Sequence, residues 1–185
     1  MRNRIIAVVV LLFVVSCTLF VPVSAENFNQ ITVVNVNEYS EIPFDNLPAN
    51  TVYIFPLDTA PQNAVYSITA NANVTTSAPD DDTPRYNANA NKYVFAGSCD
   101  SDEDLYSADY LTGNIRYTIY IENLKWLFDQ TVECYNYNNR CILTLEIPNG
   151  SGAYGLVEPN YQTWYFKFPG SCNVEGWVKG GNLIG

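Results

Sequence analysis

The chain has 185 residues, with 9 lysines and arginines against 19 aspartates and glutamates, and no histidine. This acidic balance argues against nucleic acid or an anionic membrane as a partner, because both need a basic face. The absence of histidine excludes Ser-His-Asp and Cys-His nucleophile systems and histidine metal ligands. Any enzyme built from this chain would therefore depend on carboxylates.

The first 25 residues have the parts of a secretory signal peptide. Two arginines precede an apolar run over residues 5–21, and small residues precede an expected cleavage after Ala25. Two alternatives stay open: an uncleaved N-terminal anchor, and a lipoprotein with Cys17 as the lipidated residue. Cleavage predicts a secreted, extracellular protein in which residues 26–185 form one domain. That domain keeps seven basic and nineteen acidic residues, a net charge of −12.

Beyond the leader, apolar residues recur with period two, which predicts strands rather than helices. The expected strands cover residues 31–36, 51–57, 65–74, 92–96, 115–121, 140–148, 163–168 and 175–178. In 163–168, for example, tryptophan and phenylalanines alternate with Tyr165 and Lys167. Residues 122–130 fit a short helix or a strand equally well. Segments rich in Pro, Gly, Asn and Asp separate the strands, so we expect an all-β fold, an antiparallel β-sandwich or jelly roll of about eight short strands.

Four cysteines remain after the leader: Cys99, Cys134, Cys141 and Cys172. An even number in an oxidising compartment predicts two disulfides that staple the fold, with three pairings open. A tight asparagine turn would place Cys134 opposite Cys141 across a hairpin, which favours that pair and leaves Cys99 for Cys172.

An acidic stretch over residues 99–109 is a candidate cation site. The candidate calcium ligands are Asp100, Asp102, Asp104 and Asp109. Their spacing begins like an EF-hand loop, but Leu105 and Leu111 stand where glycine and a bidentate glutamate belong, so the stretch is not an EF-hand. One interpretation is a calcium loop of a different type, and Ca²⁺ is the one cofactor that the sequence suggests. The second interpretation is an acidic surface loop that opposes strand-to-strand association.

Carboxylates on or beside the strands are the candidates for glycoside hydrolysis, which needs two of them. They are Glu122, Glu133, Glu146, Glu158 and Glu175. Nothing in the sequence pairs any two, and each is also typical of a solvated, outward-facing strand residue. We therefore assign no catalytic residue.

Aromatic residues are abundant and mixed with asparagine, which suits sugars because flat rings stack on pyranose faces while amides and hydroxyls bind ring hydroxyls. The candidate ligand-binding residues are Tyr120, Tyr135, Tyr137, Tyr154, Tyr161, Tyr165 and Trp177. The alternative is that these rings are ordinary strand formers with a buried body and a wet tip. Asn73 and Asn149 begin N-glycosylation sequons in or beside predicted loops.

The sequence predicts a secreted, non-enzymatic binding or adhesion module whose ligand is a glycan or a cell-surface or matrix component. We expect no nucleic-acid partner and no stable membrane insertion after cleavage. One alternative is a subunit of an extracellular filament or matrix that self-associates through strand edges, for which an unpaired edge near residues 26–36 would argue. The other is a small carboxylate-dependent glycoside hydrolase.

Overall fold

The computed structural model describes residues 31–61, 73–100, 102–113, 116–125, 127–159 and 163–181. The predicted signal peptide, most of the expected strand 65–74, and Tyr161 lie outside these residues. Strands make up 55% of the structure and helix 7%, so the predicted all-β class is confirmed.

The strands are β1 (Thr32–Asn35), β2 (Thr51–Pro56), β3 (Val74–Thr75), β4 (Arg85–Asn87), β5 (Tyr93–Cys99), β6 (Leu105–Ser107), β7 (Tyr110–Thr112), β8 (Tyr117–Asn123), β9 (Gln130–Asn136), β10 (Cys141–Ile147), β11 (Ser151–Val157), β12 (Thr163–Phe168) and β13 (Cys172–Gly180). Three 3-10 turns accompany them: η1 (Tyr39–Glu41), η2 (Phe44–Asn46) and η3 (Leu57–Thr59). The described residues of 122–130 contain no helix, since β8 runs to Asn123 and β9 begins at Gln130.

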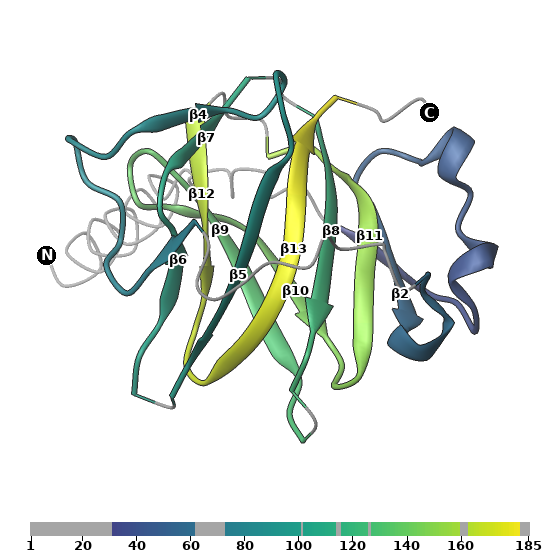
Figure 1. Cartoon of the computed structure of the whole chain (residues 1–185). Helices are drawn as coiled ribbons and strands as arrows, with labels where there is room; N and C mark the ends of the chain where they lie inside the picture. The colour runs from purple at the N-terminus through teal and green to yellow at the C-terminus, as the bar shows by residue number, and fades with distance from the viewer. Residues whose placement is uncertain are drawn as a thin grey trace, which may run out of the picture.

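The strands form two curled sheets (Figure 1). The six-stranded sheet has the order β1-β2-β11-β8-β13-β5, and the seven-stranded sheet has the order β10-β9-β12-β6-β3, with β7 on β12 and β4 on β7. Most neighbours are antiparallel, but β1 is parallel to β2 and β4 to β7. Neighbouring strands such as β8 and β13 are distant in sequence, so long-range pairing builds both sheets.

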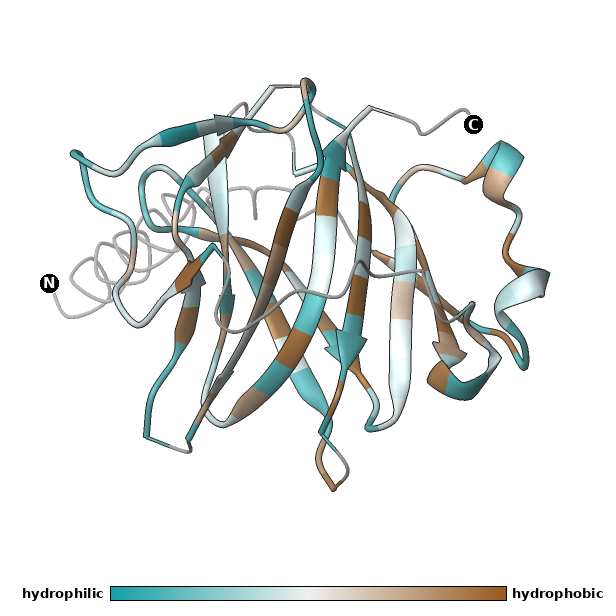
Figure 2. Ribbon diagram, in the orientation of Figure 1, coloured by the Kyte–Doolittle hydropathy of each residue, from teal (hydrophilic) through white to brown (hydrophobic). Residues whose placement is uncertain are grey.

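Apolar side chains from both sheets pack into one core cluster. It contains Ile119 and Ile121 from the six-stranded sheet and Trp164, Phe166 and Phe168 from the seven-stranded sheet. The alternation predicted for 163–168 is therefore confirmed, and Figure 2 shows similar banding of hydrophobic and hydrophilic residues along β13. Because alternate residues face the core, the intervening residues of each strand lie on an outer face.

A second apolar cluster lies on the outer face of the six-stranded sheet, beneath residues 39–47 and 57–60, which we call the N-terminal segment. Tyr39 and Phe44 from this segment pack against Tyr154, with ring centroids 6.4 and 5.0 Å away. In Figure 1 the same segment, coloured purple to blue, lies at the end of the sheet that carries β2. The N-terminal segment thus covers one outer face, whereas the outer face of the seven-stranded sheet carries a different group of aromatic residues.

Candidate functional site

Five tyrosines gather on and beside the outer face of the seven-stranded sheet, and we call them the tyrosine surface. They are Tyr106, Tyr110, Tyr135, Tyr137 and Tyr165. Strand register brings them together, because β12 pairs Tyr165 with Tyr135 of β9 on the side away from the core. Tyr137 follows β9 in the turn that leads to β10.

Two of these rings are buried and support the others. Tyr165 stacks on Tyr135 with centroids 5.3 Å apart and an interplanar angle of 12°. The ring of Tyr110 meets the ring of Tyr165 edge-on, with centroids 5.8 Å apart. It also lies tilted against the ring of Tyr137, with centroids 5.3 Å apart. Tyr110 and Tyr165 are buried, Tyr135 and Tyr106 are half-buried, and Tyr137 is 40% exposed. Ring contacts of this kind hold aromatic side chains in fixed orientations, so the exposed rings stand on a rigid base.

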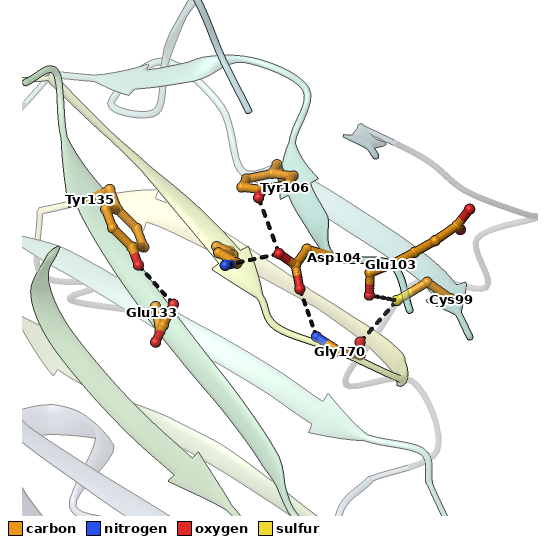
Figure 3. Close-up of polar contacts among 8 residues, drawn as sticks. Cys99, Glu103, Asp104, Tyr106, Glu133, Tyr135 and Gly170 are labelled. Carbon is orange, nitrogen blue, oxygen red and sulfur yellow. Dashed lines mark hydrogen bonds and ion pairs between the residues drawn. The ribbon is translucent and has the colours of Figure 1, made fainter. Parts of the chain in front are cut away.

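Carboxylates lie beside the tyrosine hydroxyls (Figure 3). Tyr135 donates a 2.9 Å hydrogen bond to Glu133, and Tyr106 donates a 3.2 Å bond to Asp104. Lys167 lies 2.9 Å from the same Asp104 carboxylate, whose other oxygen accepts the backbone N–H of Gly170 at 2.8 Å. The carboxylates at this face are thus fixed in place by tyrosines, a lysine and the backbone.

A further carboxylate lies beside the most exposed ring. Tyr137 donates a 2.7 Å hydrogen bond to Asp81, and the Arg85 guanidinium lies 5.7 Å from the centroid of the same ring. Each of the three tyrosines nearest solvent therefore has its own acidic neighbour.

The protonation states of these groups follow from their contacts. Burial raises the pKa of Tyr135 and of Tyr165 to about 12, so both hydroxyls stay neutral donors at physiological pH. The hydrogen bond from Lys167, together with that from Gly170, lowers the pKa of Asp104, which keeps this carboxylate charged. The surface therefore offers aromatic carbon, neutral hydroxyls and charged hydrogen-bond acceptors side by side.

The remaining predicted ligand-binding residues lie elsewhere. Tyr120, Tyr154 and Trp177 are in register on the outer face of the six-stranded sheet and are 0%, 5% and 4% exposed. They pack under the N-terminal segment and are closed to a ligand in this structure. The described members of the predicted set thus divide between the covered cluster and the tyrosine surface, and Tyr106 and Tyr110 belong to the tyrosine surface without having been predicted from the sequence.

Two of the candidate carboxylates do form a pair. Glu122 of β8 is directly opposite Glu175 of β13, and Tyr120 donates a hydrogen bond to Glu122. Partial burial, followed by the charge of Glu122 and a hydrogen bond with it, raises the pKa of Glu175. Glu175 therefore keeps its proton to a higher pH than an isolated glutamate would.

The other carboxylates are dispersed. Glu158 forms a 2.5 Å ion pair with Arg116, Glu146 is exposed on β10, and Glu133 belongs to the tyrosine surface. The structure therefore brings together Glu122 and Glu175 but does not add a third candidate carboxylate to them.

The four candidate calcium ligands are not gathered around one point. Asp104 is engaged by Lys167, whereas Asp109 interacts with Tyr93 and has a pKa raised by burial. Asp100 and Asp102 lie exposed in the loop before β6. Within the described ranges no group of three or more Asp, Glu or Cys side chains is placed to hold a metal ion. Calcium binding stays a prediction from the sequence.

The cysteines lie near one another in two pairs. Cys99 of β5 is directly opposite Cys172 of β13, and their sulfur atoms are 2.9 Å apart. The predicted hairpin between Cys134 and Cys141 is present, but the two residues are not directly opposed. A register shift after Cys141 places it opposite Tyr135, and Cys134 opposite Leu143. None of the four described cysteines is disulfide-bonded in the structure, so neither bond is confirmed.

A hollow of about 510 Å³ lies beside the Cys99–Cys172 pair. It is lined by Ser98, Cys99, Asp100, Glu103, Leu124, Lys125, Leu127, Phe128, Ser171, Cys172 and Asn173. Leu127 and Phe128 are 55% and 65% exposed, and the lining contains none of the predicted ligand-binding aromatics.

Both sequons lie at exposed positions. Asn73 precedes β3, and its side-chain nitrogen donates a 2.6 Å bond to the carbonyl of Val94. Asn149 lies in the turn between β10 and β11, beside Gly150, whose φ is +65°. A glycan at either residue would extend from the surface.

Fold and site together define an all-β protein that carries an aromatic surface flanked by carboxylates on one sheet. Comparison with known family models, curated proteins and solved structures finds no match to this chain. In the part of the chain that the structure describes, no helix has the length and apolar character needed to span a membrane.

Proposed function

We propose that this protein is a secreted, non-enzymatic binding module that recognises a neutral glycan through the tyrosine surface. The observation that carries the proposal is the convergence of Tyr135, Tyr137 and Tyr106 on one outer face, each hydrogen-bonded to a carboxylate. Rings supply stacking area, and carboxylates accept hydrogen bonds from sugar hydroxyls. The negative charge of the domain favours a neutral ligand over an acidic one.

In this proposal the two sheets form a β-sandwich stapled by two disulfides, which suits an extracellular compartment. A rigid sandwich holds its surface residues in place, so little conformational entropy is lost when a ligand binds. Support comes from the core cluster shared by both sheets and from the register match of Cys99 with Cys172.

The hydrolase alternative is less well supported. Glu122 and Glu175 are paired, but they are hydrogen-bonded to each other. Glycosidases hold their two carboxyl groups roughly 5–9 Å apart, so that a sugar or a water fits between them. The filament or matrix alternative is favoured by one observation, the position of β1 at the edge of its sheet.

The proposal is tested by screening the oxidised domain against immobilised neutral and acidic glycans, followed by calorimetry on the best ligand. Tyr137→Ala combined with Tyr135→Ala should weaken binding roughly tenfold or more, about 1.4 kcal/mol. Tyr154→Phe, a change inside the covered cluster, is the matched control and should leave affinity unchanged. Binding that survives the double substitution, or that is confined to acidic glycans, contradicts the proposal.

A further inference from the structure

Within the described residues, the edge of the six-stranded sheet at β1 has none of the usual protection. Residues 31–37 contain no charged residue and no proline. Charged side chains, prolines or covering loops normally stop an edge strand from pairing with another chain. Val33 is 48% exposed, although Ile31 on the same side of the strand packs against the core cluster. The sheet therefore extends at β1 beyond the cover of the opposite sheet.

Other strand edges in the described residues are protected. The carbonyl of Val94 in β5, the opposite edge of the same sheet, accepts a hydrogen bond from Asn73. β10 carries the exposed Glu146, and β4 begins at the exposed Arg85. β3 has only two residues. β1 is thus the edge best able to accept another strand.

The backbone of β1 fixes which groups are free to pair. The N–H group of Thr32 donates to the carbonyl of Asn50, just before β2, and the N–H group of Val36 donates to the carbonyl of Ile54 in β2. In a parallel ladder alternate residues bond the same neighbour, so Val33 and Asn35 direct their N–H and C=O groups away from β2. Among the described residues nothing bonds these outward groups.

We propose that β1 pairs antiparallel with β1 of a second copy of this chain, on a two-fold axis beside Val34. In this register Val33 is opposite Asn35 of the second copy, and Asn35 is opposite its Val33. The two outward residues of each strand then exchange four hydrogen bonds in two pairs. The six-stranded sheets join into one continuous sheet through the two β1 strands.

A second copy fits this edge because its β1 offers the same outward N–H and C=O groups, so the free groups of both strands are paired. On the other side of the strand, Val34 and Val36 pack against the covered cluster. The two-fold therefore places Val34 against its own counterpart and continues an apolar surface across the interface. The interface is small, and both copies are acidic, so the dimer is weak and strengthens as salt screens the repulsion.

The symmetry has a consequence that rests on the proposed glycan binding. A two-fold axis perpendicular to a sheet keeps each face of both copies on the same side. The two tyrosine surfaces consequently face the same direction, and both can contact one glycan-coated surface. While the dimer is intact, such bivalent binding raises the apparent affinity by about 10²–10⁴-fold without any new contact.

Charge substitutions at positions 33 and 35 test the register directly. Val33→Lys with Asn35→Lys places like charges opposite each other and should give a monomer by sedimentation equilibrium, at concentrations where the wild type is a dimer. Val33→Lys with Asn35→Glu places opposite charges across the same pairs and should restore the dimer. Circular dichroism melts of both variants should match the melt of the wild type, which is the control that the fold is intact.

A wild type that stays monomeric at millimolar concentration and high salt overturns the proposal. So does a Lys/Glu variant no more associated than the Lys/Lys variant. Open polymers in place of a closed dimer would overturn it in favour of a filament, and dimers insensitive to both variants would place the interface elsewhere. These measurements contain no glycan. The proposed function is tested separately, by the binding of the monomeric variant to a soluble, single-site glycan.

Discussion

A disulfide between Cys99 and Cys172 would make a large contribution to the stability of the fold. The two residues are directly opposed on neighbouring antiparallel strands. Opposed residues in such a pair have Cα atoms about 4.5–5.5 Å apart, inside the range of about 4.4–6.8 Å that a disulfide requires. The sulfur atoms are already 2.9 Å apart, so bond formation needs no rearrangement of the strands.

The magnitude follows from the length of chain that the bond closes. The cysteines are 73 positions apart, and the chain-entropy relation gives a stabilisation of about 4.4 kcal/mol for a loop of that length. That is a large share of the roughly 5–15 kcal/mol by which domains are stable.

The variant Cys134→Ser with Cys141→Ser, made without the predicted leader and its Cys17, isolates this bond, because only Cys99 and Cys172 then remain. Oxidised protein should show no titratable thiol after denaturation. Reduction should lower the free energy of unfolding in guanidinium by about 4 kcal/mol. Two titratable thiols in protein recovered from an oxidising compartment would show that the bond does not form. A denaturation midpoint unchanged by reduction would show that the bond does not stabilise the fold.

Two further predictions concern β13. Glu175→Gln removes the repulsion from Glu122 and should stabilise the protein near neutral pH by roughly 0.2–1 kcal/mol, reduced by solvent because the pair is partly exposed. The pKa of Glu175 is raised in the folded protein, so the protonated side chain favours the folded state over the unfolded state. This contribution to stability is complete below the ordinary value of 4.5 and is lost as pH rises through the folded pKa. The stability difference between variant and wild type, from urea melts, should therefore shrink toward acid, and a difference independent of pH would count against the pairing. Gly176→Ala should destabilise the protein by about 1–3 kcal/mol, because its Cβ would lie 2.2 Å from the backbone oxygen of Tyr120. If the alanine variant has the same melting temperature as the wild type, β8 and β13 can move apart at this position without loss of stability.

The alternation of apolar and polar residues predicted which side chains of β12 face the core and which face outward. Trp164, Phe166 and Phe168 pack in the core, and Tyr165 and Lys167 lie outside, as expected from period two. The strand β11 was missed, because its glycines are typical of turns. Gly155 is needed there, since a Cβ would lie 2.2 Å from the backbone oxygen of Thr51 in β2. Close approach of two strands is a tertiary requirement that a local pattern does not show.

The tyrosine surface could be predicted only in part. Tyr135, Tyr137 and Tyr165 were candidates by composition, but their convergence depends on the pairing of β9 with β12, which is set by long-range register. Tyr106 was missed, although Leu105 and Ser107 on either side of it are buried in β6 and mark an alternating strand. The acidic residues before it favoured a calcium loop and obscured that alternation.

Long-range register also explains the pairs that the sequence could not give. Glu122 and Glu175 are 53 positions apart and meet only because β8 and β13 are neighbours. For Cys134 and Cys141 the predicted turn was sufficient to give the hairpin but not the register shift after Cys141. A bulge of this kind changes which residues are opposed without changing the apolar pattern.

Backbone amide chemical-shift mapping with the best neutral glycan from the screen is the sharpest test of glycan recognition by the tyrosine surface. We expect the largest shifts on β6, β9 and β12 and in the turn that carries Tyr137. Residues under the N-terminal segment, such as Tyr154, should stay unperturbed. Shifts concentrated around the covered cluster, or in the hollow beside Cys99, would contradict the assignment of the tyrosine surface as the binding site.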